Sequence, residues 1–169
     1  EQAFDTIVLN SVVQYFPSVD YFLRVLEGAI KCLKPGGSIF LGDLRSLPLL
    51  RVLHTSVEIH TSAPSLPVSE LQRQAQRRIA QEKELVLDPA LFTVLRSRLP
   101  QISQISVQLK RGRYHNELSK FRYDVTIRVG AEPVESVKQP WLDWQIEELH
   151  LENIRRILTT TTHDILAIK

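Results

Sequence analysis

The chain has 169 residues, of which 43% are hydrophobic and 24% charged, and this balance argues against low-complexity disorder and for a folded domain of ordinary size. The 21 Lys and Arg residues against 19 Asp and Glu give a net charge of +2, which is too small to indicate binding to nucleic acid. No apolar run approaches the roughly 20 residues that a membrane-spanning helix needs, so no membrane partner is expected.

The first part of the chain predicts a βαβ unit. Residues Thr6–Leu9 are apolar and β-branched, which is typical of a strand buried on both faces of a parallel sheet. From Val19 to Leu33 the apolar residues recur at helical spacing, and Ser18 is placed to cap this helix. The Lys-Pro-Gly-Gly run at 34–37 predicts a stop and a turn, and Ser38–Asp43 predicts a second buried strand.

The middle of the chain predicts three helices and a strand pair. The helices cover residues 47–60, 69–84 and 88–100, and the second has few large apolar side chains, as expected of a surface helix or lid. Residues 102–110 and 121–129 alternate apolar and polar side chains, which predicts two strands with one face in water. We expect these strands to pair antiparallel across a long loop.

The end of the chain predicts a linker and a small extension. Residues 130–140 hold two prolines and several charges. Beyond them, a strand is predicted at 141–145, a helix at 151–158 and a strand at 164–168. The predicted organisation is one α/β domain over 1–130, a linker over 131–140 and an extension over 141–169.

Polar residues come directly after both strands of the βαβ unit. Asn10 and Ser11 come after the first strand, and Asp43 and Arg45 after the second. Parallel sheets bind their ligands at the carboxyl ends of the strands, so these residues are candidates for a site. Turn capping, or a surface ion pair between Asp43 and Arg45, would also explain them. The six glycines form neither a G-x-G-x-x-G nor a P-loop pattern, so no nucleotide site is complete within these residues.

The cysteine and the histidines do not suggest a metal or a nucleophile. Cys32 lies in the last turn of the first predicted helix with no His near it in sequence, and we predict a buried, inert thiol. His54 and His60 are six residues apart, which places them on nearly opposite faces of a helix. We therefore expect no metal site.

The loop at 110–117 concentrates charged and aromatic residues. It is either a solvated hairpin loop or a wall of the site that offers His115 or Glu117 to a substrate amine. The residues alone leave both interpretations open.

Three segments of the chain resemble a known family. They are FDTIVLNSVVQYFP at 4–17, LKPGGSIFLGDLRS at 33–46 and LKRGRYHNELSKFRYDV at 109–125. All three are similar to parts of the S-adenosylmethionine-dependent methyltransferase domains embedded in non-ribosomal peptide synthetases, and the third is the most distinctive. The tail from Trp141 also resembles the segment that lies after these domains in the synthetases.

The resemblance implies an α/β fold, namely the C-terminal half of a class I (Rossmann-like) methyltransferase sheet. It also implies an antiparallel last strand pair and a small α+β C-terminal extension. The glycine-rich loop that holds S-adenosylmethionine in such domains is absent from this chain, and the chain contains no Met. We therefore expect a piece excised from a longer protein, inactive by itself, with an open edge at Thr6–Leu9 that favours a homodimer.

The resemblance also assigns roles to residues. For cofactor binding they are Asn10, Ser11 and Gln14. For catalysis they are Tyr15, Asp43, His115 and Glu117. For substrate binding they are Arg45, His54, Tyr114 and Asn116.

The implied reaction is N-methylation of an aminoacyl or peptidyl group held on a carrier protein, among neighbouring synthetase domains in the cytoplasm. Its alternatives are methylation of carbon or oxygen in a related synthetase, and a non-catalytic structural or interaction fragment. The acidic carrier is expected to meet basic side chains of the second predicted helix, unless these form only a solvated face. They are Arg73, Arg77, Arg78 and Lys83.

Overall fold

Two parallel strands and the helix between them begin the fold, as predicted. The computed structural model describes residues 2–130, 141–160 and 166–169. Strand β1 (Phe4–Asn10) is followed by a short 3-10 helix η1 (Val13–Tyr15), then α1 (Val19–Cys32) and β2 (Leu33–Ser46). The Ser18 side chain accepts a hydrogen bond from the Tyr21 backbone N–H at 3.2 Å and caps α1.

The sheet is mixed and has the order β1-β2-β5-β4. β1 is parallel to β2, whereas β5 (Arg122–Val129) is antiparallel to both β2 and β4 (Ile102–Leu109). The short strand β3 (Val86–Leu87), which the sequence did not predict, pairs in parallel with the end of β2. The prediction of a mixed α/β fold with an antiparallel last pair is thereby confirmed.

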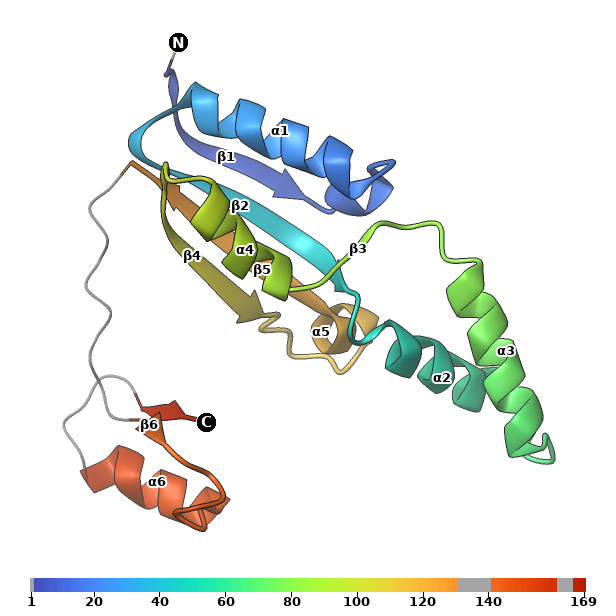
Figure 1. Ribbon diagram of the computed structural model, residues 1–169. Coiled ribbons are helices and arrows are strands. Elements are labelled where there is room, and N and C mark those ends of the chain that lie inside the picture. The colour runs from blue at the N-terminus through green and yellow to red at the C-terminus, as the bar shows by residue number, and fades with distance from the viewer. Residues whose placement is uncertain (1, 131–140, 161–165) are drawn as a thin grey trace. The chain divides into compact units, whose positions relative to one another are not determined.

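Helices α1 and α4 (Ala90–Arg98) cover the same face of the sheet (Figure 1). Phe22 of α1 and Phe92 of α4 meet edge to face with ring centroids 6.2 Å apart, and Phe92 meets Tyr123 of β5 in the same way. Leu41 of β2 and Val125 of β5 lie beneath them, fully buried. Burial of these large apolar groups is the main stabilising contribution to this unit.

The first strand is less buried than its sequence predicts. Val8 is 59% exposed, whereas Ile7 and Leu9, which point to the other face of the sheet, pack against the core. β1 is also an edge strand in the part of the chain that the structure describes. The predicted burial on both faces is therefore wrong, whereas the predicted open edge is confirmed. Cys32 lies beside this edge and is exposed, so the prediction of a buried thiol is also wrong.

The Lys-Pro-Gly-Gly run ends α1 as predicted but does not separate it from the next strand. Phe4 pairs with Leu33 and Thr6 pairs with Ser38. An advance of two residues along β1 therefore corresponds to an advance of five residues along β2. Residues 34–37 therefore form an irregular bulge at the start of β2, in which Gly36 adopts a φ of 83°. Glycine adopts this left-handed backbone without the steric cost of a Cβ.

Helices α2 (Leu50–Thr61) and α3 (Val68–Ala80) pack against each other and form an arm that projects from the sheet (Figure 1). α3 ends before residue 84, the predicted boundary. The Glu82 carboxylate accepts hydrogen bonds from the backbone N–H groups of Lys83 and Glu84, both at 3.0 Å. These local bonds hold the chain in a turn and compete with the helix.

Residues 1–132 and 133–169 form two separate units. The second contains β6 (Trp141–Leu142), α6 (Leu151–Thr160) and β7 (Ala167–Ile168), with β6 and β7 paired in parallel. The predicted linker at 131–140 and the start of the last predicted strand lie outside the described residues. Among the helices of the described ranges, none is long and apolar enough to cross a membrane.

Candidate functional site

Ser11 and Asp43 meet just beyond Asn10 and Gly42, the last pair of the β1–β2 register, and β2 itself continues to Ser46. The Ser11 hydroxyl donates a hydrogen bond to Asp43 Oδ2. Both residues have left-handed backbone, with φ of 55° at Ser11 and 62° at Asp43, which is costly for a residue with a Cβ. A bulge in β2 between Leu41 and Leu44 contributes to this turn of the backbone. Strain of this kind clusters at functional sites, so this edge of the sheet is the candidate site.

Asn10 lies beside the same pair and over Gly42. Asn10 and Gly42 are partners in the β1–β2 register, and a Cβ on Gly42 would lie 2.0 Å from Asn10 Oδ1. The Asn10 amide nitrogen is 3.4 Å from Ser11 Oγ. The glycine therefore makes room for the Asn10 side chain next to the hydroxyl of Ser11.

Lys110 and Asp124 complete the site, and the sequence prediction missed both roles. Lys110 Nζ lies 2.7 Å from Asp43 Oδ1 and donates to Asp124 Oδ1 at 3.1 Å. The same Asp124 oxygen accepts a hydrogen bond from the Asp43 backbone N–H at 3.0 Å. Lys110 comes directly after β4 and Asp124 lies in β5, so only the strand register brings them to Asp43.

The two charges of the site stabilise each other. Burial by itself would raise the pKa of Asp43, but hydrogen bonds from Lys110 and Ser11 and the charge of Lys110 hold it below its ordinary value of 3.8. Burial would lower the pKa of Lys110, but its contacts with Asp43 and Asp124 raise it above 10.5. At neutral pH Asp43 is thus a carboxylate and Lys110 an ammonium, so Lys110 cannot act as a base there.

Two neighbouring residues of η1 have opposite environments. Gln14 is 4% exposed, and its Oε1 has no hydrogen-bond partner among the described residues. Its backbone carbonyl accepts a hydrogen bond from Leu85 N–H at 2.8 Å, which ties η1 to the segment after α3. Tyr15 is 73% exposed. A buried hydrogen-bond acceptor without a partner lowers stability, so Gln14 Oε1 is a candidate to accept a hydrogen bond from a ligand.

Arg45 and His54 meet on a third residue, Glu82, which was not predicted. Glu82 Oε2 lies 3.0 Å from Arg45 Nη1 and 3.1 Å from His54 Nε2, and Arg45 also donates to Glu84 at 2.9 Å. Burial would raise the pKa of Glu82, but the Glu84 N–H, the charge of Arg45 and the His54 hydrogen bond lower it. The ion pair between Asp43 and Arg45 considered from the sequence is wrong, because each has other partners.

The loop after β4 lines a pocket of about 380 Å³ that includes Lys110 and Asp124. Tyr114 lines it and is 81% exposed, whereas His115 is exposed and absent from the lining. Because Lys110 also contacts Asp43, this pocket adjoins the Ser11–Asp43 pair.

Part of the predicted loop is helical. Helix α5 (Glu117–Phe121) starts at Asn116, whose side chain accepts a hydrogen bond from Ser119 N–H at 3.1 Å. Glu117 pairs with Arg122 at 2.9 Å. The pattern N-x-x-S is the capping signal that could have predicted this helix. Asn116 thus caps α5, and Glu117 forms an ion pair with Arg122.

The described residues contain no group of three or more His, Cys, Asp or Glu side chains placed to hold a metal ion. The functional groups of the candidate site are the carboxylates of Asp43 and Asp124, the hydroxyl of Ser11, the amide of Asn10 and the ammonium of Lys110.

No family model matches the chain. It is 47% identical over 158 residues to the chondramide synthase cmdD of Chondromyces crocatus, an alignment that covers 94% of this chain and 4% of that protein. It is 33% identical to the nonribosomal peptide synthetase penN of Penicillium thymicola, over 93% of this chain and 6% of the synthetase. It is 32% identical to the beauvericin nonribosomal cyclodepsipeptide synthetase of Beauveria bassiana, over 91% of this chain and 5% of the synthetase. The chain is thus similar, over nearly its whole length, to a small segment of large peptide synthetases.

Proposed function

We propose that this chain is the acceptor-facing part of an S-adenosylmethionine-dependent methyltransferase domain within a non-ribosomal peptide synthetase. The proposed reaction of the whole domain is N-methylation of an aminoacyl or peptidyl group held on a carrier protein. The similarity to segments of peptide synthetases supports the setting. The methyltransferase activity rests on the three segments that resemble such domains and on the candidate site.

One observation carries the proposal, namely the Ser11–Asp43 hydrogen bond at the carboxyl end of β1, where its parallel pairing with β2 stops. Ligands of α/β sheets bind at this edge. Both residues keep a left-handed backbone, and the contacts of Lys110 and Asp124 hold the site in place. Such strain is retained where a side chain must point in one direction, as in a binding site.

The residues at the end of β1 fit S-adenosylmethionine in one respect that can be tested. Gln14 Oε1 is a buried acceptor without a partner among the described residues, and the cofactor carries amino and hydroxyl donors that could satisfy it. Asn10 and Ser11, four and three positions before Gln14 in the sequence, present an amide and a hydroxyl. When bound, S-adenosylmethionine supplies an electrophilic methyl group on a sulfonium. Asn10, Ser11 and Gln14 are the residues of this chain that would hold it.

Asp43 has the chemistry to assist the acceptor. Methyl transfer places positive charge on the acceptor nitrogen, and an ionised carboxylate stabilises such charge in a site that excludes water. The hydrogen bond from Ser11 and the contact with Lys110 fix the orientation of the carboxylate before the substrate arrives. The enzyme's main task is then to align the amine for in-line displacement.

The state of Asp43 favours nitrogen over carbon as the acceptor. An α-amino group has a reference pKa of about 7.7 to 8.0, so it reacts with little help from a base. Removal of a proton from carbon needs a stronger base than a carboxylate whose pKa is held below 3.8. Asp43 therefore suits an amine acceptor in the proposed reaction.

The test is a transfer assay with the intact parent synthetase, a carrier loaded with an amino acid and S-adenosylmethionine labelled in the methyl group. The proposal predicts label on the α-nitrogen. Label on the α-carbon or on a hydroxyl would overturn the choice of acceptor, and no transfer by a folded, carrier-loaded synthetase would overturn the methyltransferase assignment.

The isolated chain tests the alternative of a non-catalytic fragment. Calorimetric titration of the chain with S-adenosylmethionine measures whether the residues present here bind the cofactor by themselves. Micromolar binding that Gln14→Ala weakens would contradict a purely structural fragment.

A further inference from the structure

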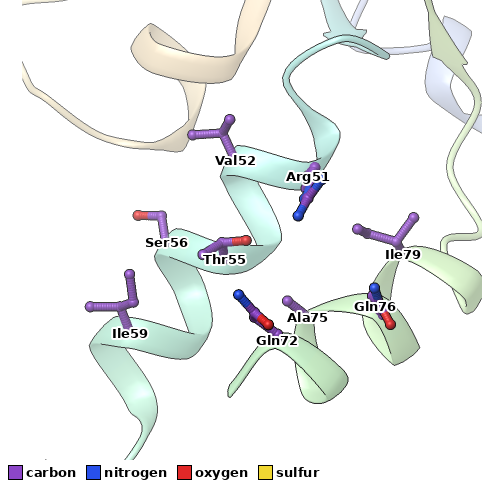
Figure 2. Close-up of a pocket in the computed structure, with 9 residues that line it drawn as sticks. All are labelled: Arg51, Val52, Thr55, Ser56, Ile59, Gln72, Ala75, Gln76 and Ile79. Carbon is purple, nitrogen blue, oxygen red and sulfur yellow. The ribbon is translucent and has the colours of Figure 1, made fainter. Parts of the chain in front are cut away.

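A groove runs between the two helices of the arm, away from the Ser11–Asp43 site. Its volume is about 410 Å³, and it is lined by side chains of α2 and α3 (Figure 2). Figure 2 shows Val52, Ser56 and Ile59 along one side of α2, and Ala75 and Ile79 on α3. The spacing of these residues, at three, four and seven positions, gives each helix one continuous face.

The groove is open and exposes large apolar side chains beside the polar Thr55, Ser56, Gln72 and Gln76. Val52 is 54% exposed and Ile59 is 65% exposed, whereas Ala75, which also lines the groove, is 3% exposed. A small side chain between exposed larger ones produces a depression that a third helix can fill. The usual occupant of a groove between two helices is an amphipathic helix whose apolar residues face inward.

The charge around the groove is positive. Arg51 is the one charged residue among the nine that line it, and it makes no ion pair with any residue that the structure describes. The two glutamates of the arm are already engaged, because Glu58 pairs with Arg78 and Glu70 pairs with Arg73 at 2.5 Å. A carboxylate on a partner helix could therefore pair with the guanidinium of Arg51. It would not be repelled by an unpaired carboxylate of α2 or α3.

The basic residues of α3 do not form a single face, in contrast to the prediction from the sequence. Arg73 and Arg77 are absent from the residues that line the groove, and the helical spacing turns Arg77 well away from the face of Gln72 and Gln76. Arg78 is held by Glu58 of α2. Arg73 is held by Glu70, so Arg51 is the unpaired cation among the residues that line the groove.

We propose that the groove between α2 and α3 docks an acidic amphipathic helix of a partner protein, with the partner's apolar residues in the groove and a carboxylate of the partner on Arg51. The proposal concerns a surface separate from the Ser11–Asp43 site and does not depend on the methyltransferase reaction. Specificity comes from the charge of Arg51, and affinity comes from the burial of Val52 and Ile59.

The test uses the full chain and two synthetic probes. The first is an amphipathic helical peptide of about 18 residues with Leu on one face and Glu on the other. The second has the same sequence with every Glu replaced by Lys. Fluorescence anisotropy at low salt is expected to show that the acidic peptide binds at least about tenfold more tightly than the basic one. Equal affinity for the two peptides, or no saturable binding of the acidic one, would overturn the proposal.

Variants locate the binding surface. Arg51→Glu is expected to weaken the acidic peptide about fivefold or more and to strengthen the basic one, whereas Arg96→Glu on α4 leaves both unchanged. The double change Val52→Ser and Ile59→Ser is expected to weaken the acidic peptide about tenfold. Val94→Ser, at an α4 side chain that is 48% exposed, is its matched control.

Circular dichroism establishes that each variant is folded before binding is measured. An acidic peptide that binds Arg51→Glu as tightly as the unchanged chain contradicts the assignment of the surface. If sedimentation instead shows a dimer that the Val52→Ser and Ile59→Ser change dissociates, the occupant is a second copy and the proposal is wrong.

Discussion

Ser11 donates a hydrogen bond to Asp43 at the point where the parallel pairing of β1 and β2 stops, and both residues adopt left-handed backbone. Two further contacts stabilise Asp43 in this strained conformation. Lys110 forms an ion pair with its carboxylate, and Asp124 accepts a hydrogen bond from its backbone N–H. The site is therefore assembled before any ligand arrives, and its stability can be measured in the absence of one.

Two substitutions of Asp43 distinguish the contribution of its charge to stability from the contribution of its backbone conformation. Asp43→Asn keeps a side chain that tolerates left-handed backbone but loses the ion pair with Lys110, and we expect unfolding free energy to fall by about 1–2 kcal/mol. Asp43→Ala also loses that tolerance and is expected to cost about 1 kcal/mol more. Urea denaturation measures both. Equal stability of the two variants would mean that the backbone at residue 43 is not strained.

Gly42→Ala tests the close approach of Asn10. The new Cβ would lie 2.0 Å from Asn10 Oδ1, so either the amide or the strand must shift. Such overpacking costs about 1–3 kcal/mol of unfolding free energy. The double variant Asn10→Ala, Gly42→Ala is expected to recover part of this loss in a double-mutant cycle. No recovery would show that the strain comes from another neighbour, such as Phe40.

The stability of the chain should depend on pH in a defined way. Folding lowers the pKa of Asp43 and Glu82 from 3.8 and 4.5, so their contribution to stability is present above about pH 5 and is lost as pH falls through the lowered values. Folding raises the pKa of Lys110 from 10.5, so its contribution is present below that pH and is lost as pH rises through the raised value.

The corresponding measurement is unfolding free energy between about pH 2 and pH 11. These groups predict a plateau between about pH 5 and pH 10. Asp43→Asn is expected to reduce the slope of unfolding free energy against pH on the acid side, because it removes one of the two carboxylates whose pKa is lowered by folding. An acid slope identical to that of the unchanged chain would contradict the assigned role of Asp43.

Cys32 is expected to react readily with a thiol reagent in the native chain. It is exposed beside the open edge of β1, in a groove that Phe4 and Ile7 also line. A colorimetric thiol assay in the absence of denaturant should titrate one thiol per chain at nearly the rate seen in urea. A native rate many-fold slower would show that another surface covers this edge, such as that of a second copy.

The sequence predicted the parts of the structure that have local causes. Ser18 caps α1 because a capping serine acts within one turn, and Asn10, Ser11 and Asp43 lie together because parallel strands end at one edge. Lys110 and Asp124 could not be placed in this way, because their approach to Asp43 depends on the register of β4, β5 and β2. The burial of Val8 and Cys32 was predicted wrongly, because it depends on what covers the second face of β1 and its open edge, which no local pattern specifies.

The central claim is that Asp43 belongs to a methyl-transfer site, and the rate of methyl transfer by the intact parent synthetase tests it most directly. Asp43→Asn is compared with Asp5→Asn, which alters an exposed ion pair with Lys34. We predict that Asp43→Asn lowers the rate at least about tenfold while Asp5→Asn leaves it unchanged. Equal rates for the two folded variants, or no methyl transfer by the unchanged synthetase, would contradict the account.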